Sequence, residues 1–161
     1  MVDFNAIAEI DSAATNDAKG RALESLVGDL LVSVGGLKPM EYRLRTPSEE
    51  LDLVLHNHCL NPFMQKWGPI IVVEYKNWFS PVGASEFHIF AEKVRNRAGQ
   101  CRVGIFVAWN GVTKGFMHEA VRRSRDPYVI VLLERRGIEA AIGTGDTQRY
   151  LQQSYSEAVS R

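Results

Sequence analysis

The apolar positions in the first part of the chain repeat with the period of a helix. Between residues 16 and 34 they follow one another at intervals of three and four, which gives one buried stripe on an amphipathic helix. Asn16 or Asp17 is expected to cap the start of this helix, and Gly35 and Gly36 to end it. A weaker helical pattern covers residues 4–14. The stripe consists of Leu23, Leu26, Val27, Leu30, Leu31 and Val34.

The next part of the chain changes to the short apolar runs that are typical of strands. Residues 40–45, 51–55 and 69–78 are predicted to be three successive strands, with a turn at 46–48 and a loop at 56–68. The third run is continuously apolar over residues 70–73, so we expect it to be central in a sheet and covered on both faces.

From residue 84 onward, helical and strand patterns alternate. Helices are predicted over 84–97 and 113–125, the second capped by Thr113, and strands over 103–109 and 128–133. Residues 138–142 form a weak sixth element, and 143–161 a polar C-terminal helix or tail. Successive strands favour an antiparallel meander, and later alternation favours parallel crossovers. We therefore predict an α/β fold, a mixed central sheet flanked by helices in the order α-β-β-β-α-β-α-β.

Composition limits the class of protein. The 161 residues are 45% hydrophobic and 24% charged, an ordinary globular mixture, and we expect one domain over residues 1–161. The apolar run at 70–73 is too short to cross a bilayer, and the N-terminus lacks a basic start followed by an apolar stretch. We therefore expect neither a membrane protein nor a secreted one. Cys59 and Cys101 cannot form a disulfide framework, which favours a cytoplasmic location.

Charge is balanced overall but not along the chain. Residues 1–80 contain 7 Lys and Arg against 11 Asp and Glu, and residues 81–161 contain 12 against 8. An acidic half that holds metal ligands and a basic half that grips phosphate would give this pattern, and so would chance.

Glu74 and Lys76 are the most informative charged residues. They stand two apart near the end of the apolar strand, so both project from the same face of the sheet. Residues at this spacing lie too far apart for an ideal ion pair, which favours a site for a cation and a water over a structural pair. Asp52 enters the preceding strand and meets Glu74 if the two strands are neighbours. Glu24, on the first long helix, is expected to reach the same point.

An acid on the first helix, an Asp entering one strand and Glu-x-Lys ending the next resemble the PD-(D/E)xK nuclease superfamily, and most of all its Mrr-like restriction endonucleases. Leu51 and Leu53 depart from the Pro and Gly that often flank the Asp in that branch. The similarity spans residues 20–133 and includes GRALE at 20–24, ELDLV at 50–54, VEYKN at 73–77, SPVG at 80–83, GIFV at 104–107 and GVTKG at 111–115.

This resemblance implies a restriction-endonuclease-like fold with a catalytic core at about 18–134 and a C-terminal tail or helix at 143–161. It implies a Mg²⁺-dependent DNA endonuclease in restriction or anti-phage defence, with Mn²⁺ as a substitute. Asp52 and Glu74 would ligate the metal with the carbonyl of Tyr75, Lys76 would orient the attacking water, and Glu24 would assist. The alternatives are a nuclease that resembles Holliday-junction resolvases and a non-cleaving DNA-binding or assembly module with the same fold.

The expected partner is double-stranded DNA. Because the core leaves little chain for reading sequence, we expect a homodimer or a partner subunit that supplies target recognition. The candidate phosphate-gripping residues, for which solvated helix faces are the alternative reading, are Lys93, Arg95, Arg97, Lys114, Arg122, Arg123 and Arg125.

Other chemistry is less well supported by the pattern. His56, His58 and Cys59 lie close together but lack the paired spacing of a structural zinc site. Trp67, Trp78 and Trp109 are interpreted as core or rim aromatics rather than base-stacking residues.

Overall fold

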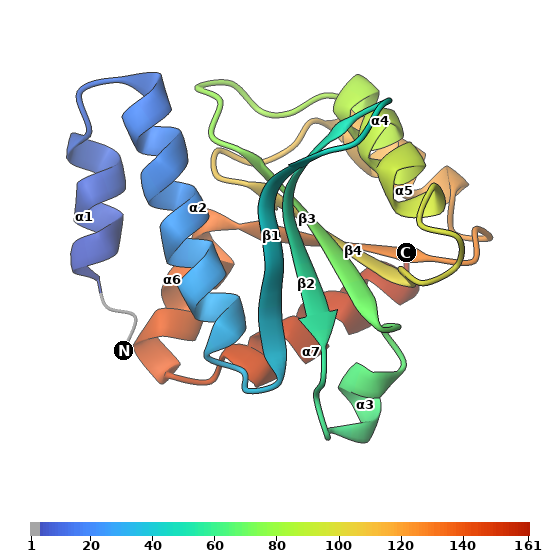
Figure 1. The fold of residues 1–161 in the computed structure, drawn as a ribbon. Helices are drawn as coiled ribbons and strands as arrows, with labels where there is room; N and C mark the ends of the chain where they lie inside the picture. Colours follow the sequence, from blue (N-terminus) through green and yellow to red (C-terminus); the bar gives the residue numbers. More distant parts are fainter. Residues whose placement is uncertain (1–3) are drawn as a thin grey trace.

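The apolar run predicted to be central lies in the middle of a five-stranded sheet. The computed structural model describes residues 4–161. The first three residues of the predicted domain lie outside it. The sheet has the order β1-β2-β3-β4-β5 (Figure 1). Its strands are β1 (Leu37–Arg45), β2 (Glu50–Asn57), β3 (Ile70–Lys76), β4 (Val103–Ala108) and β5 (Val129–Glu134).

The strand directions confirm the predicted mixed sheet. β1, β2 and β3 form an antiparallel meander. β4 and β5 each pair in parallel with the preceding strand, and the connections that carry helices α4 (Ala84–Arg95) and α5 (Lys114–Arg122) make this possible. The predicted α/β fold class is therefore confirmed.

Helices cover both faces of the sheet and create two hydrophobic cores. One core lies beneath α1 (Asn5–Ser12), α2 (Asn16–Val32), α6 (Arg135–Thr144) and α7 (Thr147–Val159), and it also takes in α3 (Pro62–Gln65). The other core lies beneath α4 and α5. Figure 1 shows α1, α2 and α6 on one side of the sheet and α4 and α5 on the other.

The central strand sends alternate side chains to the two cores. Val73 and Tyr75 pack into the core beneath α2, and Val72 packs into the core beneath α4. Glu74 has the parity of Val72 and therefore lies on the α4 side. Its position at the end of a strand buried on both faces brings a carboxylate to the edge of the core.

The β1–β2 ribbon changes faces at one pair of residues. Tyr42 lies against α2 near Gly28, whereas Leu44, two residues later, packs beneath α4. Leu53 and Leu51 on β2 show the same switch. The register places Arg43 opposite Asp52 between these pairs, and Arg43 has a φ of 53°, in the left-handed region. The ribbon therefore twists sharply where Asp52 enters it (Figure 1).

Several local predictions need correction. Thr15, not Asn16 or Asp17, caps α2 by accepting a hydrogen bond from the Ala18 amide, whereas Thr113 caps α5 as predicted. The predicted loop at 56–68 contains the one-turn helix α3, and the weak element at 138–142 belongs to helix α6. The polar C-terminal segment contains helix α7, capped by Asp146. Within residues 4–161, no helix combines the length and apolar character that crossing a bilayer requires.

Candidate active site

Asp52 and Glu74 meet where β2 and β3 separate. The antiparallel register ends at Leu53 opposite Val73, and one further step places Asp52 opposite Glu74. Beyond this point the Asp52 carboxylate continues the contact between the strands, because its Oδ2 accepts a hydrogen bond from the Tyr75 amide at 2.9 Å. The predicted convergence of the two acids follows directly from this register.

Glu74 is held by two lysines. It is only 3% exposed, and Lys76 Nζ lies 2.9 Å from its Oε1, while Lys93 Nζ lies 2.7 Å from its Oε2. The expectation that Glu74 and Lys76 are too far apart for an ideal ion pair is wrong, because their long side chains project from the same face and reach each other. Glu86 on α4 lies 3.4 Å from Lys76 and completes the charged cluster.

Burial and neighbouring charges set the protonation of this cluster. Burial, helped by the charge of Glu74, raises the pKa of Asp52 to about 6, against the lowering effects of the Tyr75 amide, Lys93 and Lys76. Burial alone would lower the pKa of Lys76, but Glu74, Glu86 and Asp52 outweigh it and raise the pKa. Lys76 is therefore an ammonium ion at neutral pH and acts as a fixed positive charge.

The donor set suits a hard divalent cation. The charge of Glu74 opposes ionisation of Asp52, and a cation between the two carboxylates would offset this repulsion. Within residues 4–161 no group of three or more His, Cys, Asp or Glu residues lies close enough to hold a metal ion. A cation here would therefore be held by Asp52 and Glu74 with water and phosphate oxygens, which is the way in which proteins commonly hold Mg²⁺.

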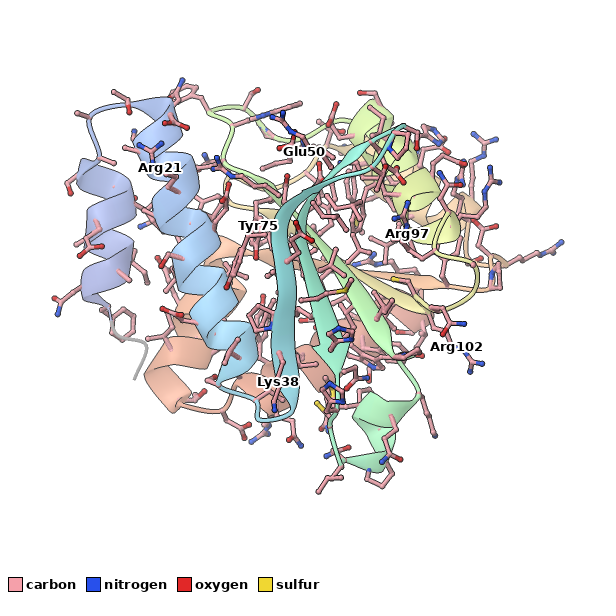
Figure 2. All side chains as sticks on the ribbon, viewed as in Figure 1. Arg21, Lys38, Glu50, Tyr75, Arg97 and Arg102 are labelled. Carbon is pink, nitrogen blue, oxygen red and sulfur yellow. The ribbon has the colours of Figure 1, made fainter. Side chains whose placement is uncertain are left out.

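Glu24 does not join the two acids. It lies on α2, on the opposite face of the sheet from α4, and both its oxygens are 3.3 Å from Arg43 Nη2. Figure 2 shows Tyr75 between α2 and the β1–β2 ribbon, on this second face. Among the described residues Glu24 makes no hydrogen bond or ion pair with Asp52 or Glu74, and its partner Arg43 also feels the charge of Asp52. The assisting role of Glu24 stays a prediction.

Sequence reasoning missed the parts that Glu86 and Arg43 play and treated Lys93 only as a surface cation. Glu86 and Lys93 stand seven residues apart on α4, which places them on one face beside the buried stripe of that helix. This spacing was a usable signal for a pair of charges that face the sheet. Arg43 gave no such signal, because the sequence pattern of a strand does not indicate which residue adopts a left-handed backbone conformation.

The other predicted DNA-binding cations are divided between paired and open positions. Arg97 is tied to Glu49 in a largely buried pair, while Arg95 and Arg122 are exposed but bridge to glutamates on their own helices. Arg123 contacts Glu92 and Asp126. Lys114, at the start of α5, and Arg125, just beyond its end, are the cations of this set for which residues 4–161 offer no ion pair, and Lys114 is exposed.

The tryptophans and the histidines that the sequence singled out lie in the core, at the rim beside Lys76 and near the end of β2. Trp67 and Trp109 are core residues and Trp78 is 44% exposed at the rim, as the interpretation of the three as core or rim aromatics predicted. His56 and His58 stack on each other with ring centroids 5.6 Å apart. Cys59 is a buried free thiol that donates toward the Gly35 carbonyl.

The domain is an α/β domain of the restriction-endonuclease-like type. It has the mixed sheet with helices on both faces, and its two acids lie where β2 and β3 separate. Among solved structures, the chain is similar to restriction endonuclease FokI bound to DNA, with a TM-score of 0.60 and 14% identity over 93% of this chain and 29% of that one. A second structure of restriction endonuclease FokI gives a TM-score of 0.61 and 15% identity, over 93% and 30% of the two chains.

The chain thus spans about three tenths of the length of the FokI structures. No family model matches the sequence, and no curated protein matches it. At this identity the structural likeness shows a restriction-endonuclease-like fold and nothing finer, so membership of the PD-(D/E)xK superfamily stays a prediction. The Mrr-like branch stays a prediction.

Proposed function

We propose that this chain is a Mg²⁺-dependent DNA endonuclease that hydrolyses phosphodiester bonds, in restriction or anti-phage defence in the cytoplasm. The observation that carries the proposal is the meeting of Asp52 and Glu74 at the open end of the β2–β3 pair, with the Lys76 ammonium 2.9 Å from Glu74. The FokI structure that shares the fold is described as bound to DNA, which supports DNA as the substrate.

The residues divide the work between holding a cation and stabilising charge. Asp52 and Glu74 would hold Mg²⁺, with the main-chain carbonyl of Tyr75 as a further ligand. When bound, the ion supplies Lewis-acid activation of the phosphate and lowers the pKa of a coordinated water. Lys76 remains charged, so it orients the attacking water and offsets negative charge on the phosphate instead of removing a proton.

Two neighbours position these groups. Glu86 holds Lys76 from α4, and Lys93 holds the second oxygen of Glu74. Because both contacts come from α4, the placement of this helix on the sheet determines the geometry of the site. Glu24, which is paired with Arg43, would assist from the α2 side of the sheet.

Plasmid cleavage tests the proposal. Wild-type protein is expected to nick or linearise plasmid in Mg²⁺ or Mn²⁺ and to be inactive in EDTA, and Glu74→Gln and Lys76→Ala are each expected to lose at least 100-fold in rate, as is usual when a charge-stabilising group is removed. The matched controls are Glu41→Gln and Lys38→Ala, exposed positions on β1 of the same sheet. Equal nicking by wild type and both site variants would dismiss the assignment.

One observation favours the non-cleaving alternative. Lys93 and Lys76 occupy both oxygens of Glu74, so the buried carboxylate already has full charge compensation from the chain. In a module with this fold that does not cleave DNA, the contacts of Glu74 with the two lysines would serve only to stabilise the fold. Calorimetry separates the two functions, because an endonuclease binds Mg²⁺ or Mn²⁺ in a way that Glu74→Gln abolishes, and an inert module gives no heat of binding with either ion.

A further inference from the structure

The loop that follows Lys76 exposes two neighbouring aromatic side chains. Trp78 is 44% exposed, and Phe79 is 103% exposed, the full value for a phenylalanine without neighbours. Large aromatic side chains usually lie in the core, as Trp67 and Trp109 do in this chain. Phe79 thus contributes nothing to the folded core and Trp78 lies only partly in it, so their exposure calls for another reason.

The loop is anchored at both ends. Its first residues continue β3, and its last part is fixed where the Val82 amide donates to the Gly111 carbonyl at 3.0 Å and the Thr113 amide donates to the Val82 carbonyl at 2.9 Å. Between these points, Asn110 Nδ2 donates to the main-chain carbonyl of Trp78 at 2.6 Å. These bonds present the two rings on a supported backbone, which lowers the entropy cost of binding through them.

The aromatic pair adjoins the candidate active site. Lys76 Nζ lies over the Trp78 ring, 5.6 Å from its centroid, so the same ammonium pairs with Glu74 and adjoins the partly exposed Trp78. Figure 1 shows the loop extending beyond the sheet from the end of β3 toward α4, at the end of the molecule where α2 begins. A cation beside exposed rings is the combination with which proteins hold unpaired nucleic acid strands, because phosphates meet charge and bases meet rings.

We propose that Trp78 and Phe79 form a stacking platform for unpaired bases beside the scissile phosphate, so that the preferred substrate carries a single-stranded or locally unstacked segment. This inference rests on the proposed function, because it takes nucleic acid as the ligand and places the rings beside the bond that is cut. Two aromatic side chains bury roughly 150–250 Å² each. That area is well below the ~800 Å² per partner of a stable protein interface, which favours a base over a second copy of the chain.

Binding in EDTA tests the platform without cleavage. The probes are a labelled single-stranded oligonucleotide, a strand of equal length and charge made of abasic sites, and a blunt duplex. Phe79→Ala is expected to weaken binding of the normal strand roughly tenfold and to leave binding of the abasic strand unchanged, because stacking needs the base and phosphate contacts do not. The matched control is Leu60→Ala, because Leu60 is 89% exposed but lies in the loop after β2, at the other end of the sheet.

Tryptophan fluorescence gives a second readout. Because Trp67 and Trp109 are buried, quenching by a bound strand is expected to come from Trp78 and to disappear in Trp78→Leu. Normal strands should quench, and abasic strands should not.

The platform would be overturned by equal affinity of wild type and Phe79→Ala for the normal strand, or by an equal loss for normal and abasic strands. A dimer that dissociates in Phe79→Ala, with no change in strand binding, would likewise overturn it and assign the rings to contact between copies. Failure of the proposed function is distinct, because it appears as absent cleavage of plasmid in Mg²⁺ while the base-dependent binding in EDTA persists.

Discussion

At the scale of single residues, Asp52 carries an ionisable group into surroundings that oppose its charge. Its pKa rises from 3.8 to about 6 through burial and the charge of Glu74. A raised pKa means that the folded state binds the proton more tightly than the unfolded state does. Without metal, ionisation of Asp52 therefore costs free energy of folding, and this cost grows as the pH rises from about 4 to above 6.

The first prediction is that Asp52→Asn stabilises the metal-free protein at pH 8 but not at pH 4. The amide oxygen still accepts the hydrogen bond of the Tyr75 amide, and no charge is buried. The difference in free energy of unfolding should grow with pH to on the order of 3 kcal/mol, because one pKa unit corresponds to about 1.4 kcal/mol. Urea unfolding in EDTA at several pH values measures it.

Asp29→Asn is the control for this experiment, since Asp29 is exposed on α2. Its effect should stay constant over the same pH range. Parallel stability curves for wild type and Asp52→Asn would contradict the raised pKa and remove the argument that the two acids oppose each other.

The second prediction concerns the buried pair of Lys93 and Glu74, which are 11% and 4% exposed in their side chains. Lys93→Met leaves Glu74 with one cation instead of two, and we expect it to lower the free energy of unfolding by about 2–4 kcal/mol. Adding Glu74→Gln to Lys93→Met should cost less than the sum of the single changes, because the charge that lacks a partner is gone. A double-mutant cycle measures this coupling, and strictly additive effects would refute the pair.

At the scale of elements, α4 determines the site, and Gly104 determines where α4 lies. A Cβ built on Gly104 would come within 2.5 Å of Val94 Cγ2 and 2.9 Å of Phe90 Cζ, both on α4. The third prediction is that Gly104→Ala pushes α4 away from β4 and lowers the free energy of unfolding by about 1–3 kcal/mol. Because α4 carries Glu86 and Lys93, cleavage should also fall in the fraction that remains folded.

Gly20→Ala is the matched control, since nothing lies within 4 Å of its added Cβ inside helix α2. It is expected to stabilise the protein by up to about 1 kcal/mol through helix propensity alone. Unfolding curves for both variants give the comparison. A Gly104→Ala protein as stable as wild type would show that α4 adapts to the methyl group without cost.

The sequence predicted the elements whose pattern is local. The alternation at Glu74 and Lys76 and the order of the strands led to the meeting with Asp52, because neighbouring strands of a meander share an edge. The one-turn helix α3 was missed, since four residues are too few to show a period. The contact of Lys93 with Glu74 depends on which face of α4 rests on the strand end, and this is decided by packing at Gly104 and not by local pattern.

At the scale of the whole molecule, the charges of the chain limit how it would hold the proposed DNA substrate. The net charge is zero, and most of the cations predicted to contact phosphate are already paired within the protein. Lys93 pairs with Glu74. The other paired cations, which contact acids on α4, α5 and the β1–β2 turn, are Arg95, Arg97, Arg122 and Arg123. Each internal pair must open, at a cost, before its cation meets a phosphate. A single copy of the chain is therefore expected to bind duplex DNA weakly.

The fourth prediction follows from counterion release. A protein that neutralises about 2–3 phosphates gives a slope of roughly −2 to −3 for the logarithm of the association constant against the logarithm of salt concentration. We expect this shallow slope for a single copy, and a steeper one when a second copy or a partner adds its own cations. Fluorescence anisotropy in EDTA over a salt series measures the slope, and sedimentation at the same concentrations gives the oligomeric state.

Lys114→Ala sharpens this measurement, because Lys114 is exposed and no ion pair within residues 4–161 has to open before it contacts phosphate. Its loss should reduce the slope by about 1, whereas Arg95→Ala should change it less, since Arg95 already bridges to Glu92. A slope steeper than about −5 in a particle that sediments as a monomer would contradict the prediction. It would mean that the ion pairs along α4 and α5 open on binding, and that one copy grips DNA without a partner.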